Sequence, residues 1–258
     1  MNYYFLGTLL PELHIGEPPE IGFREYEQLL KENLSDSDFD KTRTIRNLFD
    51  ILNLRFYWKE EPLNELGNHT ESELEEAFAT QSMLPSYVFN FMEKYESKSE
   101  RLQHFPALLS TFFTKEIEDS SGFFKAYLTL ERELRLILVA FRAKKLNRDL
   151  LIDLQYEDPE EQIIAQMLAQ KDAAVYEPPE KYEQLKIIFE KYQNQPLELQ
   201  KALVEFRFNK IEEMLGLDLF SADRALAYLV ELILVEQWQQ MDQQEGLKIV
   251  DSMLKDIS

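Results

Sequence analysis

Glycine is scarce in this chain, and this scarcity constrains the fold more than any other feature of the sequence. Only 7 of the 258 residues are glycine, whereas a typical protein carries about 7%. Sheets joined by tight turns need glycine at positions with positive φ, and helices joined by short polar or proline-containing loops do not. The composition therefore predicts an all-α, multi-helix fold.

Apolar residues recur at helical spacing along most of the chain, which predicts roughly nine or ten helices. The acid-rich stretch from Glu60 to Glu76 is expected to be a solvated loop that leads into a helix after Thr70. Residues 3–6 fit a short strand or a helical turn equally well. The expected helix starts, taken from periodicity, capping residues and prolines, are Phe23, Ser37, Thr70, Pro85, Pro106, Gly122, Asp158, Pro178, Pro196 and Ser221.

No Ser/Gly-rich linker interrupts this pattern, so we expect one helical domain over residues 1–258. Possible lobes within an elongated bundle are 1–84, 85–155 and 156–258. A faint internal repeat supports lobes, because Asn53-Leu-Arg55 is matched by Glu133-Leu-Arg135 on another apolar helix.

Residues that whole classes of site require are missing. The chain has no cysteine, which excludes disulfides, thiolate zinc sites, iron–sulfur clusters and cysteine nucleophiles. It also has neither a GxG pair nor a GxxxxGK[ST] loop, so the two common phosphate-binding loops are absent.

The charge of the chain limits its partners. A formal net charge of -20 and a pI near 4.6 disfavour binding to nucleic acid and to anionic lipid. The start of the chain lacks the basic region of a signal peptide, and its apolar runs are far shorter than the ~20 residues that span a bilayer. We therefore expect a cytoplasmic protein without a membrane span.

No catalytic or metal-binding motif is evident. His14, His69 and His104 lie in separate segments without a ligand at metal spacing, and HExxH and GxSxG are both absent. We expect no enzyme activity, no cofactor, no metal and no small-molecule substrate.

A basic cluster at the end of one apolar helix is the clearest candidate for a binding site. The apolar run Leu136–Phe141 leads directly into Arg142, Lys144, Lys145 and Arg148. These cations could simply offset the dipole of a helix C-terminus. They could instead bind an acidic protein surface, an anionic ligand or a lipid headgroup. Four cations exceed what helix capping requires, so we give weight to partner binding.

Four charged residues interrupt apolar helices: Arg55, Arg135, Glu231 and Glu236. Each carboxylate could lie at the solvent edge of its apolar stripe, form a structural ion pair, or take part in catalysis. For the two arginines, burial against an acid and contact with a partner are equally compatible with the sequence.

Two stretches resemble a poorly characterised bacterial family associated with V/A-type ATPases. They are the start of the chain, residues 3–13 with Gly16–Ile21, and the segment from Tyr127 to Asp149. The pattern of an acid, Asn-Leu-Arg and a later Arg-Ala is similar to the repeated pattern of the central-stalk C subunit, which is the d subunit of eukaryotes. Asp50 with Asn53-Leu-Arg55 and Glu133-Leu-Arg135 with Phe141-Arg-Ala143 carry this similarity.

The resemblance implies a non-catalytic, funnel-like helical spacer that couples the membrane rotor ring of a rotary ATPase to its central stalk. Its partners would be rotor-ring and central-stalk subunits, and it would lie on the cytoplasmic side of the inner membrane as part of that complex. Arg142, Lys144, Lys145 and Arg148 would be candidates for these contacts.

Two other classes of function stay open. A free-standing acidic helical adaptor would bind another protein without any connection to ion transport. An enzyme would need a deep polar cavity with perturbed acids, and Glu231 or Glu236 would be its candidates.

Overall fold

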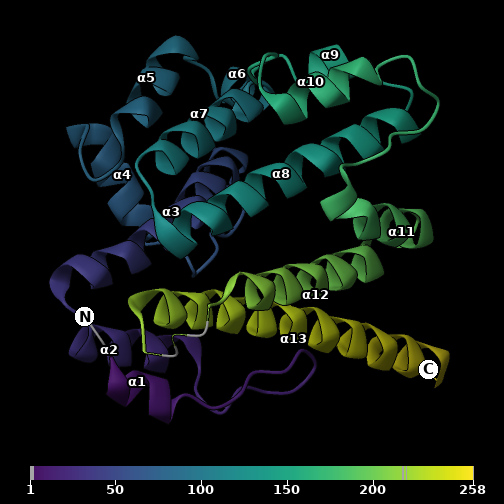
Figure 1. Cartoon of the computed structure of the whole chain (residues 1–258). Helices are drawn as coiled ribbons and strands as arrows, with labels where there is room; N and C mark the ends of the chain where they lie inside the picture. The colour runs from purple at the N-terminus through teal and green to yellow at the C-terminus, as the bar shows by residue number, and fades with distance from the viewer. Residues whose placement is uncertain (1–2, 217, 219, 258) are drawn as a thin grey trace. The chain divides into compact units, whose positions relative to one another are not determined.

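The computed structural model describes residues 3–216, 218 and 220–257, with side-chain surroundings up to residue 242 (Figure 1). Every regular element among these residues is a helix, so the predicted all-α class is confirmed. The described residues form thirteen α-helices and one 3₁₀-helix. This exceeds the expected number partly because α6 (Lys98–Gln103) and α9 (Leu150–Asp153) are too short to show a clear period.

The chain divides into two compact units. Unit 1 joins Met1–Phe39 with Glu177–Ser258, and unit 2 is Asp40–Tyr176, with the boundary inside α3 (Asp36–Lys59). These units differ from the sequential lobes 1–84, 85–155 and 156–258 because the first helices pack on the last ones. Contacts between residues so far apart in sequence leave no trace in local periodicity.

Unit 1 is built around α12 (Pro196–Met214) and α13 (Ala222–Ile257), which lie side by side (Figure 1). All residues of α13 from Ala225 to Val235 are buried, so this stretch forms the core of the unit. Residues 4–9 are helical, which settles the open choice between a strand and a helical turn. The helices of unit 1 besides the start of α3 are α1 (Tyr4–Leu9), α2 (Phe23–Asn33), η1 (Glu180–Tyr182), α11 (Glu183–Tyr192), α12 (Pro196–Met214) and α13 (Ala222–Ile257).

Unit 2 is organised by the predicted central helix, α8 (Gly122–Lys145), which packs against α7 (Phe105–Glu118) and α9. Its residues Leu128, Leu134 and Ile137 are completely buried. A capping box between Thr70 and Glu73 starts α4, as the sequence pattern predicts. The other helices of the unit are α4 (Glu71–Thr80), α5 (Ser86–Lys94), α6, α7 (Phe105–Glu118), α9 and α10 (Gln162–Ala169).

The acid-rich connection after α3 is held by two buried polar side chains of that helix. Asn53 exchanges two hydrogen bonds with the backbone of Asn64, at 2.8 and 2.9 Å. Asp50 accepts hydrogen bonds from the backbone N–H and the side chain of Asn68, both at 2.7 Å. Gly67 passes so close that a β-carbon there would lie 2.5 Å from Asn53 Nδ2. Asp50 and Asn53 therefore hold the connection after α3 in place.

None of the helices among the described residues combines the length and the apolar character that crossing a bilayer requires.

Candidate functional site

The four cations at the end of α8 are not equivalent. Lys144 donates hydrogen bonds to the carbonyl oxygens of Gln170, at 2.8 Å, and of Lys171, which follow the last turn of α10. Arg148 forms an ion pair with Asp153 at 3.1 Å. Arg142 is exposed on the last turn of α8. Lys144 therefore has a structural role, and Arg142 is the cation best placed to meet another molecule.

Three large apolar side chains lie exposed in the same short segment. The exposed fraction is 60% for Leu146, 45% for Leu151 and 63% for Ile152. Because α9 packs against α8, these side chains and the cations belong to one region of unit 2. We call it the α8–α9 surface, which consists of Arg142, Lys145, Leu146, Leu151 and Ile152. Exposed apolar groups surrounded by charge are typical of surfaces that bind another protein.

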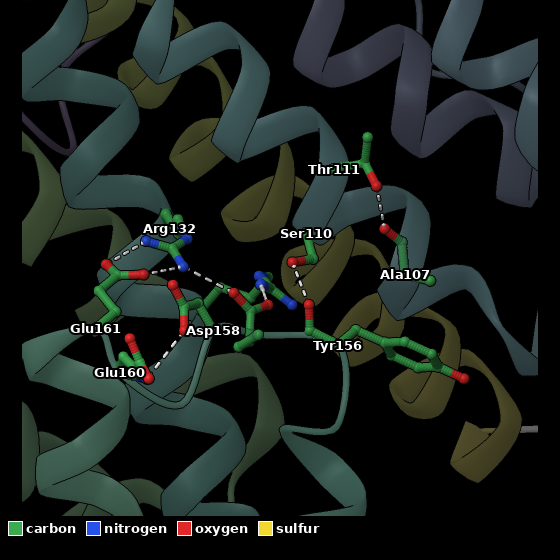
Figure 2. A network of polar contacts seen from close by, with 10 residues as sticks. Ala107, Ser110, Thr111, Arg132, Tyr156, Asp158, Glu160 and Glu161 are labelled. Atoms are coloured by element: carbon green, nitrogen blue, oxygen red, sulfur yellow. Dashed lines mark hydrogen bonds and ion pairs between the residues drawn. The ribbon is translucent and has the colours of Figure 1, made fainter.

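An ion-pair network fixes the segment that follows α9 (Figure 2). Arg132 on α8 donates to both carboxylate oxygens of Glu161 and, at 2.8 Å, to Glu157. Arg135 donates to the other oxygen of Glu157, whose side chain is only 3% exposed. Burial alone would raise the pKa of Glu157, but Arg135 and Arg132 lower it below its ordinary value. The network therefore holds residues 154–161, the connection between α9 and α10, against α8.

Arg55 and Arg135, the two arginines of the faint repeat, both lie against aromatic rings of α7. The guanidinium carbon of Arg55 is 5.8 Å from the ring centre of Phe105, and that of Arg135 is 5.6 Å from the ring centre of Phe113. Both distances suit a cation–π contact. Arg135 also has its ion pair with Glu157, so within unit 2 both side chains serve packing.

Glu236 on α13 caps the N-terminus of α2, although the two residues involved lie far apart in sequence. Its carboxylate accepts a hydrogen bond of 2.7 Å from the backbone N–H of Phe23, the first residue of α2. The N-cap position is Gly22, which has no side chain to satisfy the free N–H groups of the first turn. Glu236 supplies the missing acceptor from α13.

Glu231 lines a cavity of about 270 Å³ inside unit 1. The cavity is bounded by the segment around α1, by α12 and by α13, and its apolar wall includes Leu10, Leu13 and Phe208. Its polar lining consists of Glu12, Glu212, Arg224, Tyr228 and Glu231. Glu231 is 4% exposed and Tyr228 is 3% exposed. The cavity required for a site at Glu231 is therefore present.

Two buried polar atoms at this cavity make no hydrogen bond with any residue that the structure describes. They are Oε1 of Glu231 and the hydroxyl oxygen of Tyr228. Burial raises the pKa of Glu231 to about 7; Arg224 lowers it and Glu212 raises it further. Buried polar atoms normally have a partner, so the lack of one at these two atoms beside the cavity is unusual.

The cavity has the groups for recognition but few of those for catalysis. Its charges are three carboxylates and one guanidinium. In the part of the chain that the structure describes, no group of three or more His, Asp or Glu residues could hold a metal ion. His104 lies elsewhere, in unit 2, with its Nδ1 2.6 Å from the hydroxyl of Tyr156. The arrangement favours the binding of a charged small molecule.

Of the residues at this cavity, the sequence pointed to Glu231 alone, although a signal for two neighbours was present. Arg224, Tyr228 and Glu231 follow one another at spacings of four and three, which places them on one face of α13. Glu12 and Glu212 come from other segments, and no pattern in the sequence connects them with Glu231.

Comparison with known proteins places the chain in a family. Residues 1–257 match the family described as "Protein of unknown function (DUF2764)". The chain belongs to this family. An uncharacterized protein of Chlamydia muridarum is 28% identical over 262 residues, covering 99% of this chain and 98% of the relative. An uncharacterized protein of Chlamydia trachomatis is 29% identical over 261 residues, covering 98% of each chain. No solved structure matches the chain.

These findings correct the resemblance given above. The family that covers nearly the whole chain is described only as a family of unknown function, and the Chlamydia relatives bear no name that refers to an ATPase. The recognition of a V/A-type ATPase-associated family was therefore wrong. Short degenerate helical patterns carried it, and in this molecule contacts within unit 2 account for Asp50, Asn53, Arg55 and Arg135.

Proposed function

We propose that this protein is a non-catalytic helical adaptor that binds an acidic protein partner through the α8–α9 surface. One observation carries the proposal: Leu146, Leu151 and Ile152 are 45% to 63% exposed beside cations of a chain with net charge -20. Exposing apolar side chains to water is unfavourable, and burying them against a partner would recover that free energy.

The charge contrast selects the kind of partner. Arg142 and Lys145 form a local positive region, and on a strongly acidic molecule such a region orients an acidic surface during encounter. A partner with acidic residues around exposed apolar ones would match this arrangement. Since salt screens charges beyond about 8 Å at physiological ionic strength, binding should weaken as salt concentration rises.

Site-specific photo-crosslinking in the native host tests the proposal. A photoreactive residue at Ile152 should capture one defined acidic protein, whereas one at Ile187, which is 62% exposed in unit 1, should not. The double variant Arg142→Glu, Ile152→Ser should lose the partner. The matched control Lys125→Glu, Ile187→Ser makes the same kind of change at exposed positions elsewhere and should retain it. Equal capture at both positions, or full binding by the first double variant, would contradict the proposal.

The coupling role between a rotor ring and a central stalk is a narrower version of this proposal, and it stays a prediction. It requires that the crosslinked partner be a rotor-ring or central-stalk subunit of a rotary ATPase. Its expected location beside the inner membrane, on the cytoplasmic side, depends on the same result. A partner unrelated to ion transport would leave the adaptor function and remove the coupling role.

A further inference from the structure

The cavity at Glu231 contains an incomplete set of hydrogen bonds. Oε1 of Glu231 lacks a partner among the described residues although the side chain is 4% exposed, and the hydroxyl of Tyr228 is in the same situation. A buried carboxylate without a hydrogen-bond donor is costly. A ligand with several donors would satisfy Glu231, and the tyrosine hydroxyl could also accept a hydrogen bond from it.

The charges of the residues that line the cavity indicate whether its ligand is a cation or an anion. Glu12, Glu212 and Glu231 contribute three carboxylates, and Arg224 contributes one positive charge. This imbalance favours a cation over an anion. Tyr26 on α2 is also close enough for the charge of Glu231 to raise its pKa, although burial has the larger effect, and it adds no positive charge.

The volume of the cavity and its apolar wall limit the size and the chemistry of the rest of the ligand. A volume of about 270 Å³ lies just below the usual range of ligand pockets, about 300 to 1,000 Å³, so only a small ligand fits. Leu10, Leu13 and Phe208 offer an apolar wall to an aliphatic chain. A primary ammonium group has three donors and no acceptor, which matches the unpaired acceptor of Glu231.

We propose that this cavity binds a small aliphatic amine, with its ammonium group held by Glu231 and Tyr228 and its carbon chain against Leu10, Leu13 and Phe208. The binding site lies within unit 1, and it does not depend on the α8–α9 surface.

Thermal-shift and calorimetric titrations of the full chain test this proposal with three four-carbon probes that differ in their polar group. At about pH 8, n-butylamine should raise Tm and bind saturably, whereas butan-1-ol and butyrate should do neither. Affinity should fall as pH drops below the pKa of Glu231, near 7, because the protonated acid no longer attracts an ammonium group. An amino acid such as 4-aminobutyrate, whose carboxylate could reach Arg224, serves as a fourth probe; tighter binding than that of n-butylamine would reject a simple amine as the ligand class.

Two variants test whether amine binding requires the carboxylate of Glu231. Glu231→Gln keeps the size of the side chain and should weaken n-butylamine binding about 10- to 100-fold, as expected for a lost charge-assisted hydrogen bond. Glu205→Gln removes the same charge from an exposed position on α12 and should bind normally. The proposal is overturned if the unmodified chain does not bind the amine, if butan-1-ol or butyrate binds equally well, or if Glu231→Gln binds unchanged. Should Glu231→Gln fail to fold, the probe comparison and the pH dependence of the unmodified chain still decide.

Discussion

Glu236 on α13 accepts a hydrogen bond of 2.7 Å from the backbone N–H of Phe23, which lies 213 residues earlier in the chain. This contact joins the first residues of the chain to the last long helix within unit 1. It also explains how α2 can have a glycine as its N-cap residue, since the acceptor that Gly22 lacks comes from another helix.

Removal of this cap should destabilise unit 1. We expect Glu236→Ala to lower the free energy of unfolding by about 1 kcal/mol, the usual cost of losing an N-cap acceptor. Glu236→Gln keeps an oxygen acceptor and should cost less. Urea denaturation followed by circular dichroism measures both, with Glu205→Ala at an exposed position of α12 as the control. If all three variants are equally stable, the contact has no capping role.

Gly67 is predicted to tolerate no side chain. A β-carbon at this position would lie 2.5 Å from Asn53 Nδ2 and 2.8 Å from Asp50 Oδ1. Gly67→Ala should therefore lower the free energy of unfolding by roughly 1 to 3 kcal/mol, the range for overpacking a tight site. Gly216→Ala is the matched control because a β-carbon there meets no atom within 4 Å. Equal denaturation midpoints for the two variants would refute the close approach.

The buried network in unit 2 predicts a strong effect at Glu157. Glu157→Ala leaves Arg135 without its carboxylate and should cost about 3 kcal/mol or more in unfolding free energy. Because the pKa of Glu157 is lowered in the folded state, its contribution is present above the unfolded pKa and is lost as pH falls through the folded pKa. The exposed pair of Lys98 with Glu60 is the control, and Lys98→Ala should leave the midpoint unchanged. A small loss of unfolding free energy in Glu157→Ala would mean that the network does not stabilise the fold.

Glu231 should make the protein less stable as pH rises. Burial raises its folded pKa to about 7, against an ordinary value of 4.5. The folded state therefore holds this proton more tightly, and the resulting stabilisation is present in full below the unfolded pKa and is lost as pH rises through about 7. The difference between the two pKa values corresponds to roughly 3 kcal/mol.

Denaturation of the unmodified chain and of Glu231→Gln, without added amine, at about pH 5 and about pH 8 measures this effect. The variant cannot titrate at this position, so its stability relative to the unmodified chain should rise between the two pH values. The charged and titratable groups that face Glu231 are unchanged in the variant and act as an internal reference: Glu12, Tyr26, Glu212, Arg224 and Tyr228. A constant difference at both pH values would show that Glu231 titrates normally.

Local features of the sequence were sufficient for most of the helices, but not for the short α6 and α9. Thr70 with Glu73 forms the predicted capping box, and Pro106 and Pro196 lie in the first turns of α7 and α12. These signals act over one or two turns, so the residues that create them are neighbours in sequence. The all-α class follows from the same local information.

Only the tertiary structure shows which residues far apart in sequence contact each other. The acceptor for the N–H of Phe23, the carbonyl oxygens that bind Lys144 and the cavity beside Glu231 all depend on segments far apart in the chain. Helical periodicity shows which face of a helix is buried, but it does not identify the helix that covers it. The helical class and the unusual position of Glu231 could therefore be read from the residues alone, whereas the packing of the chain ends in unit 1 determines what surrounds that acid.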